Sequence, residues 1–304
     1  KIGQAETPAS RACIAQLLYD SLEIKLVENE SRTNKTILSD YLGYTKCTGV
    51  IYSNGVTSLA YPDVNIRENE VQIYAKEEDS SSYELHTYST TDESLKDYLG
   101  YEVEFYYQSD GSDIRTLIFC VLKDTKPLVI NAANFEMSGT TATQLKYYEN
   151  IDDDREKTAN LESENVVIYN GKLYGASENS SRFDTDMIPE VGEIKLIDSD
   201  NNGRYDVVDI TAYDVYYVSS KSTSTSEIVD NVVRVVDYPN DKTLKLDINA
   251  DRNLSIVNKS GAEVTYSSIA VGNIICLAKS SDSNGSDVVR KAVVLNDKVT
   301  GSVT

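Results

Sequence analysis

Three segments of this chain repeat one plan, and this repetition constrains the fold more than any other feature of the sequence. In each segment an apolar residue and a glycine precede a strand-like stretch, a turn rich in Asp, Gly and Ser, and a second strand-like stretch. The segments span residues 99–122, 191–213 and 271–295, at a spacing of roughly 80–90 residues. Regular self-similarity of this kind is typical of a tandem array in which each repeat is one structural unit.

Each repeated segment predicts a β-hairpin. Tyrosine (22 residues), valine, isoleucine and threonine alternate with polar residues, which indicates strands, and the turns fall at residues 109–113, 198–206 and 281–287. We therefore expect a mainly β protein made of tandem small antiparallel β-modules, each resembling a barrel or a sandwich.

One stretch near the N-terminus predicts a helix instead. Residues 8–24 begin with Pro8, which suits a first helical turn, and Ile14, Leu17, Leu18 and Leu22 form an apolar stripe at helical spacing. A Ser/Thr-rich run, residues 218–227, reads as a linker or an exposed loop. The expected division is a helix in residues 1–30, then β-modules in residues 31–126, 127–222 and 223–304.

The middle hairpin carries the spacing of a calcium loop. Its oxygen-bearing side chains stand at positions 1, 3, 5, 9 and 12, with glycine at position 6. They are Asp198, Asp200, Asn202, Asp206 and Asp209, with Gly203 at the turn and Arg204 included at position 7. Because the flanks alternate like strands, we expect this calcium site on a hairpin. The other interpretation is a plain turn, since Asp, Asn and Gly favour tight turns without a metal.

Charge excludes several classes of partner. The chain has 49 acidic and 29 basic side chains, a formal net charge of −20. This excess repels phosphates, so we expect neither a nucleic-acid partner nor an anionic membrane. No apolar run reaches the length of a membrane span, so we expect no membrane insertion.

No set of residues arranged for catalysis stands out. His86 is the sole histidine, and its alternating surroundings favour a structural role. The four cysteines lack the paired spacing of a zinc or redox site. We therefore expect no enzyme; a glycosidase that uses two carboxylates is the alternative, because so many acidic residues allow pairs to form.

A row of aromatic residues is the second candidate site. Tyr101, Val103, Phe105 and Tyr107 share one face of a predicted strand, with Tyr106 opposite. Exposed rings would offer a platform for sugars, whereas buried rings would form a core. We expect the core.

Residues 10–22, Ser-Arg-Ala-Cys-Ile-Ala-Gln-Leu-Leu-Tyr-Asp-Ser-Leu, resemble the closing helix of an S-layer homology (SLH) repeat. In that family a Thr-Arg pair starts a helix that ends in Leu-Leu-Tyr-Asn-Ala-Leu or a similar run. This chain departs from the pattern at Ser10, which stands for Thr, and at Cys13, which replaces the usual Glu and so removes a capping box. Four further stretches resemble the downstream part of SLH-bearing surface proteins of Gram-positive gut bacteria: residues 47–54, 97–107, 168–172 and 196–208.

The resemblance implies an extracellular protein at the cell wall or cell surface of a Gram-positive bacterium. It also implies attachment to secondary cell-wall polymer through three SLH repeats, of which this sequence contains the end of one. Together with the repeats and the acidity, it predicts a non-enzymatic structural module of an S-layer-type protein, with tandem β-domains rigidified by calcium. The alternative is a carbohydrate-binding or adhesion module that recognises a glycan or a host protein through surface tyrosines.

Overall fold

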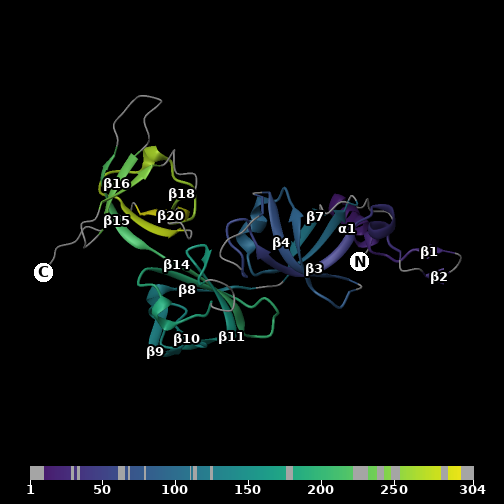
Figure 1. The fold of residues 1–304 in the computed structure, drawn as a ribbon, viewed down its shortest axis with the longest axis horizontal. Coiled ribbons are helices and arrows are strands. Elements are labelled where there is room, and N and C mark those ends of the chain that lie inside the picture. Colours follow the sequence, from purple (N-terminus) through teal and green to yellow (C-terminus); the bar gives the residue numbers. More distant parts are fainter. Residues whose placement is uncertain are drawn as a thin grey trace. The chain divides into compact units, whose positions relative to one another are not determined.

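Strands dominate the chain, as its alternating pattern predicts. The computed structural model describes residues 10–28, 31–32, 35–60, 66–67, 69–78, 80–109, 111, 115–123, 126–175, 181–221, 232–237, 243–247, 254–281 and 287–295. They form a mainly β protein with a short N-terminal helix and several separate sheets (Figure 1). The predicted fold class is therefore confirmed.

The N-terminal helix α1 spans Arg11–Leu22, inside the range predicted for it. Ser10 caps the helix, because its Oγ accepts a hydrogen bond from the Cys13 N–H at 3.1 Å. No residue of α1 is buried, and Ile14, Leu17 and Leu18 are 48, 49 and 62% exposed. The predicted apolar stripe is therefore present but largely uncovered. Among the described residues, no helix has both the length and the apolar character needed to cross a bilayer.

A short ribbon and a helical turn connect α1 to the first module. The ribbon pairs β1 (Val27–Glu28) with β2 (Ser31–Arg32), and the turn is η1 (Ile37–Tyr41). The sequence of η1 and the residues after it recurs at residues 95–101, where the structure forms a second helical turn, η2 (Glu93–Tyr98). In both copies a glycine with positive φ follows: Gly43 at 67° and Gly100 at 83°. The repeated sequence therefore forms a helical turn ended by a left-handed glycine in both copies, a π turn in η1 and a 3₁₀ turn in η2.

The first module is a closed five-stranded barrel. Its strands are β3 (Thr45–Ser53), β4 (Glu70–Glu77), β5 (Glu84–Ser89), β6 (Glu102–Ser109) and β7 (Arg115–Leu122), in the order β3-β4-β5-β7-β6. Alternate residues point inward to a core that includes Ile51, Ile73, Tyr88 and Phe105. Gly49 lets β3 approach β4 closely, because a Cβ there would lie 2.5 Å from the Tyr74 carbonyl oxygen.

The second module is a seven-stranded sheet. Its members are β8 (Leu128–Asn131), β9 (Phe135–Thr141), β10 (Gln144–Tyr147), β11 (Lys157–Tyr169), β12 (Lys172–Leu173), β13 (Gly192–Ile197) and β14 (Tyr205–Ala212), with helical turns η3 (Ala132–Asn134) and η5 (Thr185–Met187). The strand order is β8-β13-β14-β11-β10-β9, and β12 pairs with β11. Ile194, Leu196, Val208 and Ile210 lie in its core.

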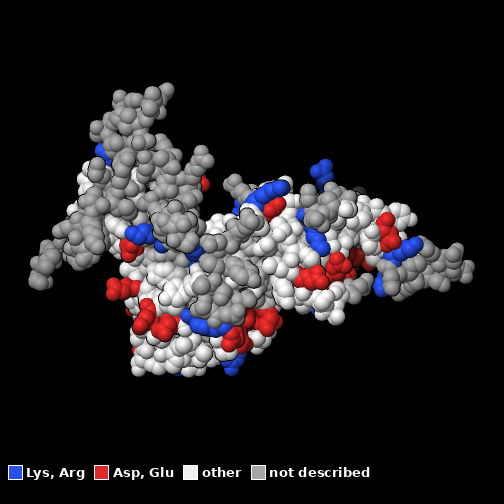
Figure 2. Space-filling model, viewed as in Figure 1, with Lys and Arg blue, Asp and Glu red and all other residues white. Residues whose placement is uncertain are grey.

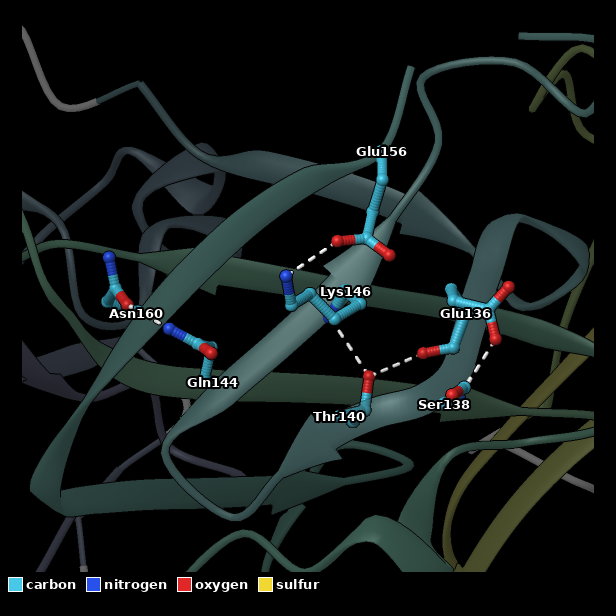
Figure 3. A network of polar contacts seen from close by, with 7 residues as sticks. All are labelled: Glu136, Ser138, Thr140, Gln144, Lys146, Glu156 and Asn160. Atoms are coloured by element: carbon cyan, nitrogen blue, oxygen red, sulfur yellow. Dashed lines mark hydrogen bonds and ion pairs between the residues drawn. The ribbon is translucent and has the colours of Figure 1, made fainter. Parts of the chain in front are cut away.

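Side-chain hydrogen bonds hold a register shift between β9 and β10 (Figure 3). Thr140 Oγ1 accepts a hydrogen bond from the Lys146 N–H at 2.9 Å and donates one to the Glu136 carbonyl at 2.6 Å. Lys146 Nζ lies 2.6 Å from a Glu156 carboxylate oxygen. Thr140 thus replaces a ladder hydrogen bond that the shift removes, so β9 stays attached to the sheet.

The third module is a six-stranded sheet. Its strands are β15 (Asp214–Lys221), β16 (Val232–Asp237), β17 (Thr243–Asp247), β18 (Leu254–Asn258), β19 (Ile274–Ser281) and β20 (Asp287–Leu295), with a helical turn η6 (Tyr266–Ser268) between β18 and β19. The strand order is β17-β16-β15-β19-β20-β18. Its core includes Val218, Leu246, Ile275 and Leu277.

The three predicted hairpins are confirmed, and each occupies the same place in its module. The strand pairs are β6–β7, β13–β14 and β19–β20, and each follows a helical turn. The first hairpin strand pairs antiparallel with the first strand of the module: β3, β8 or β15. The second hairpin strand pairs with an intermediate strand, β5, β11 or β18, in parallel. The prediction of purely antiparallel modules therefore misses one parallel pair in each.

A glycine before the hairpin makes the same backbone contacts in the first and third modules. Gly100 N–H donates to the Ile51 carbonyl, and Gly272 N–H donates to the Val218 carbonyl, each at 2.8 Å. The N–H groups of Ile51 and Val218 in turn donate to the carbonyls of Tyr101 and Asn273. Both glycines have positive φ, a conformation that glycine adopts without strain. Backbone geometry thus explains why glycine occupies this position of the sequence repeat in these two modules.

The strands differ from the predicted division at two boundaries. The β1–β2 pair joins residues 27–28 to residues 31–32 across the boundary predicted after residue 30, and the other difference lies between the second and third modules. β15 lies in the range given to the second module, 127–222, yet it pairs with β16 and β19 of the third sheet. The Ser/Thr-rich run misplaced the boundary, because its first residues, Val218–Lys221, continue β15.

By compactness the chain forms two units, residues 1–52 with 66–124 and residues 53–65 with 125–304. In the second unit, Thr57 Oγ1 accepts a hydrogen bond from the Leu173 N–H at 2.9 Å.

Candidate metal centre

Acidic side chains lie in small groups on the surface shown in Figure 2, with Lys and Arg side chains near several of them. Among the described residues, one group of three acidic side chains brings its oxygens close enough together to hold a metal ion. It consists of Asp198, Asp200 and Asp206, at the tip of the β13–β14 hairpin. These are three of the six residues that the sequence predicts.

The connection between β13 and β14 turns around the Asp198 carboxylate. The N–H groups of Asn202 and Gly203 donate to its two oxygens, at 3.1 and 2.8 Å. Asn201 and Gly203 have φ values of 57° and 89°, in the left-handed region that Asn and Gly adopt most readily. The ladder runs to Ile197↔Val207, so the predicted placement of the loop on a hairpin is confirmed.

The three carboxylates have separations that suit a calcium ion. Their nearest oxygens all lie within 4.8 Å of one another. Calcium binds oxygens at about 2.3–2.6 Å, so two oxygens on opposite sides of one ion lie about 5 Å apart. Asp198 and Asp206 are half-buried and Asp200 is exposed, which leaves one side of the group open to solvent. The residues present therefore fit a calcium ion, which further protein oxygens and water would coordinate.

Asn202 and Glu162 extend the group. The Asn202 side-chain nitrogen donates to Asp200 at 3.0 Å and to Glu162 at 3.1 Å. The amide group thus bridges two carboxylates and reduces their repulsion. Asn202 Oδ1, the predicted ligand atom, accepts a hydrogen bond from the Arg204 N–H at 2.8 Å instead. The Arg204 side chain is directed to the Leu161 carbonyl, at 3.4 Å.

Glu162 reaches the loop because the parallel pair of β11 and β14 is interrupted. Leu161 pairs with Tyr205 and Val166 pairs with Val207, so four residues of β11 bulge out opposite one residue of β14. Buried Asn165 holds the bulge: its side-chain nitrogen donates to the Glu162 carbonyl at 2.7 Å, and its Oδ1 accepts from the Phe183 N–H at 2.8 Å. Sequence reasoning missed Glu162, because nothing in the sequence around it shows that β11 pairs with β14.

Asp209 lies apart from the other predicted ligands. It belongs to β14, where side chains alternate between the two faces, so residues 206 and 209 point to opposite sides. Its carboxylate pairs with Lys195, directly across the ladder, at 2.9 Å. The twelfth position of a calcium loop converges on the ion when a helix follows, and here a strand follows. The assignment of Asp209 as a ligand is therefore corrected.

Burial and neighbouring negative charges together raise the proton affinity of Asp206. Burial, together with the negative charges of Asp200, Asp198 and Glu162, raises the pKa of this carboxyl to about 6. The Ser199 N–H, which donates to Asp206 at 2.6 Å, opposes the rise. A bound cation would act in the same direction as that N–H, since it favours the charged carboxylate. The hydrogen bonds of the loop also suit a metal-free turn, but a plain turn does not require three carboxylates whose oxygens lie within 4.8 Å of one another.

The aromatic row lies in the core of the first barrel. Tyr101, Val103, Phe105 and Tyr107 are all buried, which confirms the expectation that they form a core, and Tyr106 is buried as well. Exposed aromatic rings lie elsewhere on the barrel. Tyr74 and Tyr83 are 42 and 41% exposed, and their rings stack with centroids 5.4 Å apart.

Comparison with known proteins gives this chain no family. No protein-family model matches the sequence, and no curated protein matches it either.

Proposed function

We propose that this chain is a non-enzymatic structural module of an extracellular cell-surface protein of the S-layer type. Its β-modules follow one another along the chain as structural units, and calcium rigidifies the second module at the β13–β14 loop.

One observation carries the structural part of this proposal: the same strand plan occurs in three consecutive modules. Each module is completed by its own hairpin and its own parallel pair. Arrays of small similar units are suited to bearing load or spanning distance, because each added unit extends the molecule. The features that recur in all three modules are features of the backbone: the hairpin, the parallel pair and the helical turn before the hairpin.

The calcium part depends on the group of Asp198, Asp200 and Asp206 with Glu162 beside it. A cation there would neutralise close carboxylates and link β11 to the tip of the β13–β14 hairpin. It would therefore stiffen the second module where its parallel ladder is interrupted. Extracellular calcium modules bind with dissociation constants of about 10⁻⁴–10⁻³ M, which is adequate outside the cell.

The location at the cell surface is proposed from the resemblance of residues 10–22 to an SLH closing helix. The helical cap at Ser10 and the exposed stripe of Ile14, Leu17 and Leu18 support it. A closing helix would present such a stripe to the rest of its repeat.

Single-molecule force spectroscopy tests the array and the ion together. A chain pulled from its ends in 5 mM EDTA is expected to unfold in three events. With 10 mM CaCl₂, one event should move to higher force, and Asp198→Ala should abolish that shift while leaving the other two events unchanged. A single unfolding event would contradict the array; a calcium-insensitive force trace would contradict the metal site.

A carbohydrate-binding or adhesion function is the second candidate, and the stacked pair Tyr74–Tyr83 favours it. Tyr52 extends the pair, with its ring centroid 5.8 Å from that of Tyr74, and the Lys76 ammonium lies 5.1 Å from the centroid of Tyr83. Aromatic faces at a surface stack on sugar rings. A glycan array should show a ligand whose binding is lost in Tyr74→Ala and kept in Tyr217→Ala, an exposed tyrosine of the third module. An array without a ligand would remove this candidate.

A further inference from the structure

A cavity of about 210 Å³ lies at one end of the first barrel. The inward-facing side chains of two strands change from apolar to polar as they approach it. On β4 the row runs Val71, Ile73, Ala75 and then Glu77; on β5 it runs Tyr88, His86 and then Glu84. Polar side chains therefore occupy inward-facing positions that hold core residues further along the same strands. This end of the barrel is open and polar. We call this cavity the barrel mouth.

Tyr88 lies at the inner end of the barrel mouth and has an unpaired hydroxyl. Its side chain is fully buried, and its OH has no hydrogen-bond partner among the described residues. Its ring is fixed by edge contacts with Phe105 and Tyr107, at centroid distances of 5.0 and 5.5 Å. The neighbouring Tyr107 hydroxyl, by contrast, donates to Glu77 at 2.8 Å. Burial raises the pKa of Tyr88, so its hydroxyl keeps its proton and is a donor that points to a missing acceptor.

Arg115 supplies a positive charge beside that hydroxyl. Its guanidinium carbon lies 5.9 Å from the ring centroid of Tyr88 and 5.3 Å from that of Tyr107. Its N–H groups are close enough to the hydroxyl oxygen to oppose the rise in the pKa of Tyr88. A guanidinium can only donate, so the hydroxyl proton still has no acceptor among the described residues. In the part of the chain that the structure describes, the guanidinium pairs with no carboxylate, although acidic residues are abundant. Arg115 and Tyr88 together form a donor pair suited to a carboxylate.

The opposite wall of the barrel mouth is acidic. Glu77 uses one carboxylate oxygen for Tyr107, which leaves the other oxygen for a further donor. Glu84 lies 3.2 Å from His86 Nε2, and burial and Arg115 lower the pKa of His86, so this imidazole is neutral at pH 7. The wall therefore carries two negative charges, and Ser80 and Ser82 add hydroxyl groups. A simple anion would be repelled by this wall, and a simple cation by Arg115.

We propose that the barrel mouth binds a small zwitterion, a molecule of amino-acid size that carries one carboxylate and one ammonium group. The carboxylate accepts hydrogen bonds from Arg115 and from the Tyr88 hydroxyl. The ammonium group donates to Glu77 and Glu84. This arrangement satisfies the buried hydroxyl and pairs charges of both signs.

An NMR titration of the ¹⁵N-labelled chain tests the site. The probes are glycine, β-alanine and γ-aminobutyrate, which differ in the separation of their two charges, with acetate and ethylammonium as single-charge controls. At least one zwitterion should give saturable shifts confined to β4, β5 and the start of β7, with at least tenfold higher affinity than either control. The proposal is overturned if no zwitterion saturates, or if acetate binds as tightly as the best zwitterion.

Four variants at the barrel mouth, compared with two surface controls, test which side chains hold the probe. Arg115→Gln and Glu77→Gln should each weaken binding at least tenfold, whereas the charge-matched surface controls Arg155→Gln and Glu190→Gln should bind as the unchanged chain does. If Arg115→Gln disturbs the fold, seen as lost amide dispersion, Arg115→Lys replaces it and should bind the same probe more weakly. Tyr88→Phe should weaken binding and, without probe, raise the melting temperature, because it removes an unpaired buried hydroxyl. Unaltered binding in both Arg115 and Glu77 variants would place the probe elsewhere and overturn the proposal.

Discussion

The loop at residues 198–206 and the barrel mouth are both polar groups at strand ends, in modules that share one plan, yet they are built in opposite ways. The loop takes its carboxylates from one short stretch of chain, with Glu162 as the distant addition. The barrel mouth takes each of its charged groups from a different place along β4, β5 and β7. The clustered side chains of the loop are all carboxylates, whereas the barrel mouth carries charges of both signs. The difference shows that modules with the same strand arrangement can carry different kinds of polar site at the ends of their strands.

The largest effect on stability is expected from a core substitution in the first module, which should abolish one site and leave the other intact. Phe105→Ala removes a fully buried ring from the barrel and should cost about 3–5 kcal/mol of the stability of the first module. Binding at the barrel mouth should be lost with it, while the calcium response of the second module persists. Calorimetry with and without calcium measures both. Loss of the calcium response would show that the two sites depend on one another.

Calcium should give the next largest effect, confined to the second module. At 10 mM calcium and a dissociation constant of about 10⁻⁴ M, the expected stabilisation is about 2.7 kcal/mol. Asp200→Ala should remove most of it, and Asp209→Asn should leave it unchanged, because Asp209 pairs with Lys195. Thermal unfolding monitored by circular dichroism is the measurement. A calcium effect that requires Asp209 would restore the twelve-residue loop predicted from sequence.

A pH effect should follow from Asp206 when calcium is chelated. Its folded pKa of about 6 lies above the ordinary value of 3.8, so the folded state binds this proton more tightly. The second module should therefore gain stability from this group as pH falls from 7 through 6 towards 4, on the order of 2 kcal/mol. The difference in unfolding free energy between the unchanged chain and Asp206→Asn isolates this contribution from other carboxyls. Saturating calcium should remove the gain; a flat difference between pH 4 and 7 would refute the raised pKa of Asp206.

The smallest effect on stability is expected from replacing one glycine in the connection of each of two equivalent hairpins. Gly203 and Gly111 both have positive φ, 89° and 86°, and a Cβ at either would meet nothing within 4 Å. Alanine should cost about 1 kcal/mol at each because of backbone strain alone. Gly203→Ala should also weaken calcium binding, whereas Gly111→Ala should not. Chemical denaturation with and without calcium separates strain from binding, and equal calcium affinities would show that the turn geometry does not shape the site.

The sequence predicts local features well and distant pairings poorly. The three hairpins, α1 and the loop around Asp198 all lie within short stretches, where alternation, helical spacing and turn residues are visible. The parallel pairs are not visible, because β11 and β14 are joined by a long connection and no local signal identifies the partner. For the same reason the sequence identifies Asp198, Asp200 and Asp206 but not Glu162. It also misplaces Asp209, because strand alternation after the loop differs from the helix that a calcium loop usually precedes.

The parallel pair has a consequence for how a module is made during synthesis. The intermediate strand of each module (β5, β11 or β18) leaves the ribosome before the hairpin strand that it must pair with. Pairing between residues so distant in the chain is slow to form. A nascent module therefore stays incomplete until its last strand emerges, so the hairpin that marks each module in the sequence repeat is also the part that completes its sheet.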